Sequence, residues 1–185
     1  RYLAPLLDSV CEQLDNDIQF IVVDPGSTDG SQELLKAHRD FITHIIFEPD
    51  EGPADGLNRG FALAQGQIGY FINSDDLMMP NTVRTLRRLW SEHKDVDVML
   101  GNGWMIDQEG NPIRELRTSR QATLSAFLHG RAVLVQQGMS FQMSTFRKVG
   151  GFNPDNRTCW DYELLCQMLA IGAKAITVPD RLGAF

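Results

Sequence analysis

Two adjacent carboxylates, Asp75 and Asp76, directly follow an apolar segment of this sequence. Two ionised carboxylates held side by side repel each other unless a cation compensates their charge. Oxygen ligands of this kind favour hard cations such as Mg²⁺ or Mn²⁺. The pair therefore predicts a divalent metal site that clamps a diphosphate. A second interpretation also fits the pair: Asp75 caps a turn and Asp76 is solvated, since aspartate is common in turns.

A second acidic turn, DPGSTDG at residues 24–30, begins with Asp24 after another apolar run. It lacks the alternating acids and closing glutamate of an EF-hand loop, and the Gly-Lys-Ser/Thr of a phosphate-binding P-loop. No G-x-G-x-x-G motif follows a predicted strand, which disfavours a dinucleotide-binding fingerprint. The turn is therefore either a ligand-binding turn or an ordinary connection in which Asp29 caps the next helix.

A third acid, Asp161, lies at the start of a predicted helix over residues 160–171. A carboxylate there is either a helix-start residue favoured by the helix dipole or a general base aimed at a ligand. The histidines share no spacing typical of a metal site, and we interpret all of them as surface or structural residues: His38, His44, His93 and His129.

Alternating helix-like and strand-like segments must position these acids. Helices are predicted over residues 3–14, 29–38, 53–66 and 80–90, and strands over 18–23, 44–47, 68–72 and 96–100. Strands separated by helices of this length indicate β-α-β units and a mainly parallel sheet. Ligands bind such sheets at the carboxyl ends of the strands. Both acidic turns follow strands, so we expect them at one edge of the sheet.

The second half is less regular. We predict helices over residues 121–128 and 160–171, a turn over 150–154, and short strands over 133–135, 139–142 and 175–178. These elements indicate a cap on the open sheet rather than a second domain.

Composition limits the function classes. A chain of 185 residues with 43% apolar and 22% charged residues is typical of one globular domain. The net charge of −7 argues against a nucleic-acid partner bound through bulk charge. No apolar run approaches the roughly 18 residues of a membrane span. Three cysteines without a C-x-x-C pair suit a reducing compartment, and we expect a cytoplasmic protein.

Four stretches in this order resemble the family 2 glycosyltransferases. They are IVVDPGSTDGS at residues 21–31, EPDEGPADGLNRGFALAQGQIGYFINSDDLMMP at 48–80, SFQMSTFRKVGGFNPD at 140–155 and CWDYELLCQMLAIGAKA at 159–175. The resemblance covers nearly the whole chain. It implies the GT-A fold: an α/β protein with a Rossmann-like, mainly parallel sheet, flanking helices and an irregular C-terminal cap on the acceptor side.

The resemblance also implies roles for individual residues. Asp24 is expected to bind the nucleobase of a sugar nucleotide, Asp75 to lie near the ribose and metal, and Asp76 to ligate the metal. Asp161 is expected to be the catalytic base. Asp55 and Asn58 are expected to lie on the helix beneath the donor, within substrate-binding reach.

We expect one catalytic domain over residues 1–185. Its nucleotide-binding part covers about 1–102 and its acceptor part about 103–185. We expect acceptor choice to lie in the loops 107–120 and 130–137. The family's first strand, with a turn that packs on the nucleobase, is expected before Arg1.

The implied reaction is metal-assisted, inverting transfer of a sugar, most often from a UDP-linked donor, to a saccharide, lipid-linked or other hydroxyl acceptor. Surface polysaccharide biosynthesis is the expected setting. The sequence is compatible with peripheral contact at the inner face of the membrane, because such contact needs no spanning helix.

Two alternatives remain at this point. A nucleotidyltransferase making sugar nucleotides should carry a Gly-rich basic loop near its first strand, and no such loop is visible. An inactive sugar-nucleotide binding module would bind donor and metal without turnover.

Overall fold

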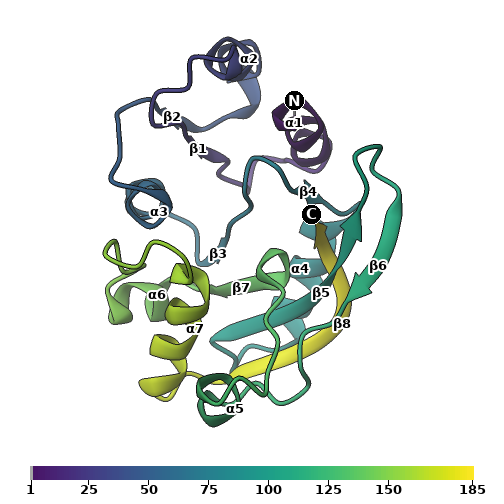
Figure 1. The fold of residues 1–185 in the computed structure, drawn as a ribbon, viewed down its shortest axis with the longest axis vertical. Helices are drawn as coiled ribbons and strands as arrows, with labels where there is room; N and C mark the ends of the chain where they lie inside the picture. The colour runs from purple at the N-terminus through teal and green to yellow at the C-terminus, as the bar shows by residue number, and fades with distance from the viewer. Residues whose placement is uncertain (1) are drawn as a thin grey trace.

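The computed structural model describes residues 2–185, and its N-terminal elements form a layer at the top of Figure 1. This layer consists of α1 (Leu3–Cys11), β1 (Ile21–Val23), α2 (Ser31–Ala37), a 3₁₀ turn (Arg39–Phe41) and β2 (His44–Ile46). The strands β1 and β2 pair in parallel, with Val22 opposite Ile45. Leu7 of α1 packs with Leu35 and Ile42, so apolar burial holds the helices onto this small sheet.

The main sheet lies below this layer and has the strand order β3-β7-β5-β8-β4, with β6 on the outer part of β5. Its strands are β3 (Ile68–Tyr70), β4 (Leu77–Met78), β5 (Val98–Ile106), β6 (Pro112–Leu116), β7 (Met139–Gln142) and β8 (Ala175–Ala184). Residues 133–135, predicted as a strand, precede a 3₁₀ turn, η2 (Gln136–Gly138), instead.

The structure has the predicted α/β class, but its main sheet is mixed. Parallel pairing joins β1 to β2 and β5 to β8, whereas β3–β7, β5–β7, β5–β6 and β4–β8 are antiparallel. The antiparallel pairs involve strands of the second half. Of these pairs, β5 and β6 are joined by a short turn, whereas β7 and β8 reach β3, β5 and β4 from distant parts of the sequence. The second half therefore completes the sheet as well as capping it.

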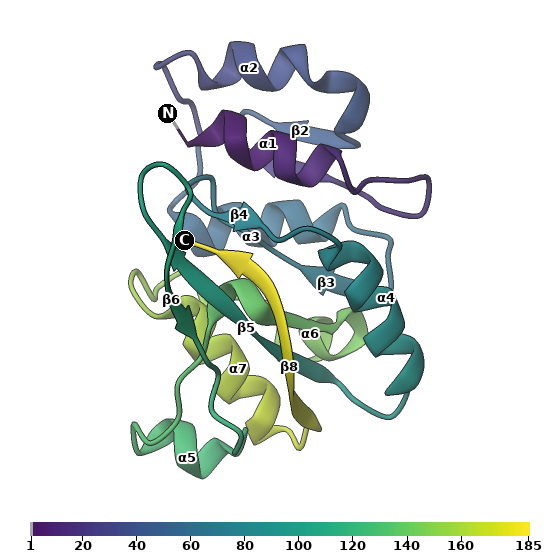
Figure 2. The same ribbon diagram turned by 90° about the vertical axis from the view of Figure 1, so that its right-hand side faces the viewer.

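Helices cover both faces of the main sheet (Figure 2). They are α3 (Pro53–Ala62), α4 (Thr82–Glu92), α5 (Leu124–Leu128), α6 (Met143–Val149) and α7 (Trp160–Ala170). Alternate residues of β5 point to opposite faces. Val98 and Leu100 belong to the core that contains α7, whereas Met99 belongs to a core with Leu89 of α4. No helix within residues 2–185 is long and apolar enough to cross a bilayer.

A chain of aromatic rings links α3, β7, α6 and α7. Phe61 of α3 lies 4.8 Å from Phe146 and 5.5 Å from Phe141, measured between ring centroids. Phe152 follows α6, and its ring lies 5.4 Å from that of Trp160, the first residue of α7. Aromatic pairs at these separations attract each other beyond simple area burial. The cluster therefore fixes where α7 begins relative to α3.

Glycines let the η2 turn approach two neighbouring strands closely. A Cβ atom on Gly138 would lie 2.4 Å from the carbonyl oxygen of Gly101 in β5. A Cβ atom on Gly183 of β8 would lie 2.5 Å from Cβ of Gln137. Because these approaches leave no room for a side chain, the backbones of η2, β5 and β8 are held together only while glycines occupy these positions.

Candidate functional site

A cavity of about 280 Å³ lies where α1 and β1 meet the acidic loop after β3. Asp24 and Asp75 both line it, so the structure brings together the acids of the two turns. Val22, Val23 and Leu35 form an apolar part of its wall. A pocket with apolar walls and a few convergent polar groups is the usual form of a small-molecule site.

Asp24 is buried, with 6% of its surface exposed, and it shapes its own turn. Its Oδ1 accepts hydrogen bonds from the backbone N–H groups of Gly26 (2.9 Å) and Ser27 (2.6 Å). Its own N–H donates to the carbonyl of Ile46 in β2. Both side-chain hydrogen bonds use Oδ1, so Oδ2 retains capacity for a ligand. Asp29 is the predicted cap of the next helix, but the N-cap residue of α2 is Gly30. Asp29 accepts a hydrogen bond from the N–H of Ser31, the first residue of α2.

Asp75 and Asp76 differ sharply in exposure. Asp75 is exposed, whereas only 3% of Asp76 is exposed. The Oδ1 atom of Asp76 accepts a hydrogen bond from Nε2 of Gln137 (3.0 Å), and its Oδ2 accepts one from the N–H of Asn73 (3.3 Å). Burial raises the pKa of Asp76 from 3.8 to about 6, because the charged form loses hydration.

The donor chemistry of this pair fits a hard divalent cation. A carboxylate offers about four lone-pair sites, and two of those on Asp76 are taken by Asn73 and Gln137. Within residues 2–185, no group of three His, Cys, Asp or Glu side chains is placed to hold a metal. Mg²⁺ commonly binds through only one or two carboxylates, with substrate phosphates and water completing its shell. Two adjacent aspartates supply the number of carboxylates that this mode of binding uses, with Asp75 exposed at the cavity and Asp76 buried next to it in the sequence.

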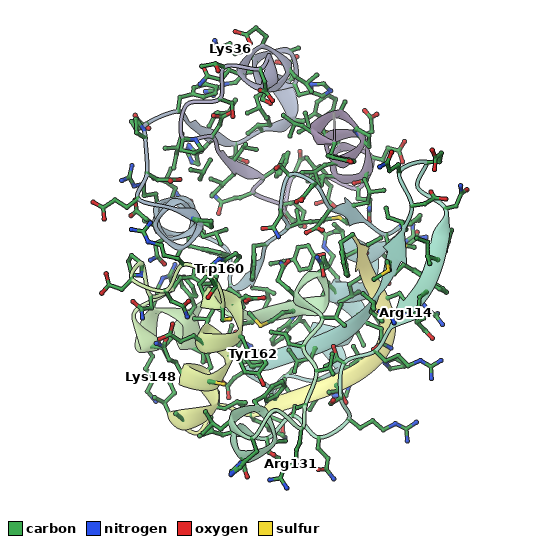
Figure 3. The ribbon with its side chains drawn as sticks, viewed as in Figure 1. Lys36, Arg114, Arg131, Lys148, Trp160 and Tyr162 are labelled. Atoms are coloured by element: carbon green, nitrogen blue, oxygen red, sulfur yellow. The ribbon has the colours of Figure 1, made fainter. Side chains whose placement is uncertain are left out.

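Asp161 lies in the first turn of α7 and is half-buried. Burial raises the pKa of this carboxyl above its usual value. It is not among the residues that line the cavity, nor is Asp76. Figure 3 shows Trp160 at the upper end of α7, near α3. The indole of Trp160 lies 5.7 Å from the ring of Phe71, four residues before Asp75, and this contact holds the start of α7 against the segment that leads to the acidic loop.

The two predicted residues of α3 make local structural contacts. Asp55 accepts a hydrogen bond from the N–H of Glu51 and forms an ion pair with Arg59, and these contacts lower its pKa. The side-chain amide of Asn58 donates to the carbonyl of Phe152 (2.8 Å) and accepts from its N–H (2.9 Å). Neither residue lines the cavity. Their substrate-binding roles stay predictions.

Sequence reasoning missed two buried glutamines beside the acidic loop. Gln136 and Gln137 lie in a segment predicted as an acceptor loop, yet less than a tenth of each is exposed. The one available signal is their position between the apolar residues Val135 and Met139, which indicates a buried turn rather than a solvated loop. The other predicted acceptor loop contains the β5–β6 turn and strand β6.

Comparisons with known proteins give a consistent result. The family model described as Glycosyl transferase family 2 matches residues 1–150. An uncharacterized glycosyltransferase of Nostoc sp. is 24% identical over 194 residues, covering 100% of this chain and 60% of the relative.

Two solved structures share the fold. The solved 1–349 portion of Staphylococcus aureus TarS aligns with a TM-score of 0.80 and 19% identity, covering 100% of this chain and 56% of that portion. The mannosyltransferase PcManGT of Pyrobaculum calidifontis aligns with a TM-score of 0.72 and 19% identity, covering 100% of this chain and 52% of that protein. The likeness shows the GT-A fold that the sequence resemblance implies. The chain spans 60% of the Nostoc relative, 52% of the solved PcManGT chain and 34% of the longer solved TarS chain.

Proposed function

We propose a sugar-transfer reaction for this chain, which belongs to glycosyl transferase family 2. It moves a sugar from a nucleoside-diphosphate sugar, for which we propose UDP as the nucleotide, to an acceptor hydroxyl with inversion. The observation that carries this proposal is the shared cavity of Asp24 and Asp75, with the start of α7 held against the segment before Asp75.

The donor end of the reaction is assigned to this cavity. Oδ2 of Asp24 would accept a hydrogen bond from the nucleobase, while Oδ1 keeps the turn in shape. Related structures support a nucleotide ligand, because TarS has been solved with UDP and with UDP-GlcNAc, and PcManGT with GDP-Man and Mn²⁺. Asp75 would lie near the ribose, and Asp55 and Asn58 would support the donor from α3.

A divalent cation, Mg²⁺ or Mn²⁺, would be held by Asp76 with help from Asp75. When bound, the cation stabilises the negative charge that develops on the leaving diphosphate. The chain's contribution is to supply oxygen ligands at a fixed place in the loop after β3.

Asp161 is assigned as the general base. A hydroxyl is a poor nucleophile until its proton is being removed. Asp161 would accept this proton while the oxygen attacks the anomeric carbon, and the bond to the diphosphate breaks on the opposite side. One displacement therefore inverts the anomeric centre. The raised pKa of Asp161 suits this role, because a general base works best when its pKa approaches the working pH.

The acceptor is assigned to the part of the chain over residues 103–185. A saccharide or a lipid-linked hydroxyl fits the proposal, as does surface polysaccharide synthesis at the inner face of the membrane. The acceptor class is the first property to measure once the donor is known.

The test has two arms. Nucleoside-diphosphate sugars are screened with Mn²⁺ or with EDTA, by thermal shift and by slow donor hydrolysis. Asp161→Asn is then compared with Asp155→Asn, a matched change at an exposed aspartate of the preceding loop. We expect Asp161→Asn to lower transfer by about 10²–10⁴-fold while donor binding persists, because general-base assistance has this magnitude. Near-normal transfer by Asp161→Asn would remove the base assignment.

The alternatives predict different results. A nucleotidyltransferase would release pyrophosphate from a nucleoside triphosphate and a sugar phosphate. A binding module would give an EDTA-sensitive thermal shift with no turnover by the wild-type protein.

A further inference from the structure

We propose that Gln137 is a positioning residue that orients the Asp76 carboxylate toward the cation, and that the η2 turn exists in this chain as the support of the acidic loop. The inference rests on the proposed function, because it takes Asp76 as the metal ligand.

Gln137 makes a direct contact with Asp76 from a distant part of the sequence. Its Nε2 donates to Oδ1 of Asp76 at 3.0 Å, and both side chains are buried. The carbonyl oxygen of Gln137 in turn accepts a hydrogen bond from the hydroxyl of Tyr70 at 2.8 Å. Tyr70 is the last residue of β3, the strand that leads to the acidic loop. Gln137 is therefore held by the same segment that it supports.

Gln136 supports the other end of the loop. Its Oε1 accepts a hydrogen bond from Nδ2 of Asn73 at 3.2 Å, and its Nε2 donates to the carbonyl of Phe71 at 3.2 Å. Asn73 also donates its backbone N–H to Oδ2 of Asp76. Oδ1 of Asp76 is therefore held by Gln137 of the η2 turn itself. Oδ2 is held by Asn73, whose side chain contacts Gln136 of the same turn.

Buried amides are costly without partners, and these glutamines have theirs in the segment between Tyr70 and Asp76. The close contact between Gly138 and Gly101 lets the η2 turn lie directly against β5, because any side chain at Gly138 would push η2 away from that strand. The arrangement therefore has the features of a support built around one carboxylate.

The functional consequence follows from how carboxylates bind metals. A hydrogen bond to one oxygen restricts rotation of the carboxylate and selects which lone pairs face a cation. Loss of such an outer contact commonly lowers metal affinity by about 10–100-fold. We expect an effect of that size from Gln137, because the environment of Asp76 leaves few other donors to replace it.

The experiment measures metal affinity directly. Wild-type protein, Gln137→Met and Gln142→Met are titrated with Mn²⁺ in the presence of UDP and, separately, of GDP by isothermal calorimetry. Gln142 is the matched control, since it donates to the carbonyl of Val96 and makes no contact with Asp76. We expect Gln137→Met to weaken Mn²⁺ binding by about 10–100-fold and Gln142→Met to leave it within about twofold.

The outcomes separate the inference from the proposed function. Absence of Mn²⁺-dependent binding of both UDP and GDP by the wild-type protein overturns the proposed function and, with it, the role of Gln137 at a metal ligand. Wild-type binding together with unchanged Mn²⁺ affinity in folded Gln137→Met overturns the role of Gln137 alone. If Gln137→Met does not fold, Gln137→Asn decides, because it keeps the amide but shortens its reach to Asp76. Unchanged affinity in that variant overturns the inference in the same way.

Discussion

Replacing Asp76 by asparagine is expected to stabilise the metal-free protein while it abolishes metal binding. The charged form of Asp76 is buried, and its pKa of about 6 records the energetic cost of that burial. The difference from 3.8 corresponds to about 3 kcal/mol, because each pKa unit is worth about 1.4 kcal/mol. An uncharged side chain of the same shape removes this cost.

The gain will be smaller than the full amount. The N–H of Asn73 and the side-chain amide of Gln137 both donate hydrogen bonds to Asp76. In Asp76→Asn, the NH₂ group of the asparagine must face one of these two donors, and that hydrogen bond is lost. One mismatched contact costs about 1–2 kcal/mol. We therefore expect Asp76→Asn to raise the free energy of unfolding by about 1–2 kcal/mol at pH 7.5.

The pH dependence gives a second check. A carboxyl whose pKa is higher in the folded than in the unfolded protein binds its proton more tightly when folded. Its contribution to stability therefore grows as the pH falls through about 6 and levels off below about 4. The wild-type protein should gain about 1–1.5 kcal/mol relative to Asp76→Asn between pH 7.5 and pH 5.

Urea denaturation in EDTA at both pH values measures these differences. Asp75→Asn serves as the matched control, because the neighbouring aspartate is exposed and should change stability by less than about 0.5 kcal/mol. The reasoning fails if Asp76→Asn is less stable than the wild type at pH 7.5 and the gap between them does not change with pH.

Two further predictions concern the elements that hold the start of α7. Gly150→Ala and Gly151→Ala both place alanine at positive φ, which lowers the free energy of unfolding by about 1–2 kcal/mol. At Gly151 the new Cβ would in addition lie 2.5 Å from Oδ1 of Asn58. Urea denaturation should find Gly151→Ala at least about 1 kcal/mol less stable than Gly150→Ala, and equal stability would contradict the contact. Leu165→Ala, at a fully buried position of α7, should lose about 2–5 kcal/mol in the same assay, whereas Leu63→Ala at an exposed position should lose under about 1 kcal/mol.

Local periodicity accounts for the parts of the fold that the sequence predicted well. The helices α1, α3 and α7 carry apolar residues at helical spacing, and β1 and β2 are short apolar runs whose character needs no distant partner. Asp24 and Asp75 meet at one cavity as predicted, but β1 and β3 belong to different sheets, so the expected shared edge of a single sheet does not account for the meeting.

Other features depend on distant partners and could not be predicted in this way. The two-residue strand β4 is defined by its pairing with β8, more than 100 residues later. The burial of Asp76 depends on Gln137, 61 residues away, so the sequence left open whether this acid was solvated. Antiparallel pairing of β7 with both β3 and β5 likewise depends on where the chain returns, which no local pattern records.

The glycines at the η2 turn have a consequence for how mutational data on this protein should be interpreted. Gly101, Gly138 and Gly183 carry no side chain, and a Cβ atom on any of them would lie 2.8 Å or less from an atom of a neighbouring element. In a saturation mutagenesis scan, we expect these glycines to tolerate substitution as poorly as the aspartates of the acidic loop. The scan alone would therefore not distinguish the two groups of residues. Under the proposed function, intolerance at an aspartate would reflect its chemical role, whereas intolerance at these glycines would reflect the close packing of η2, β5 and β8.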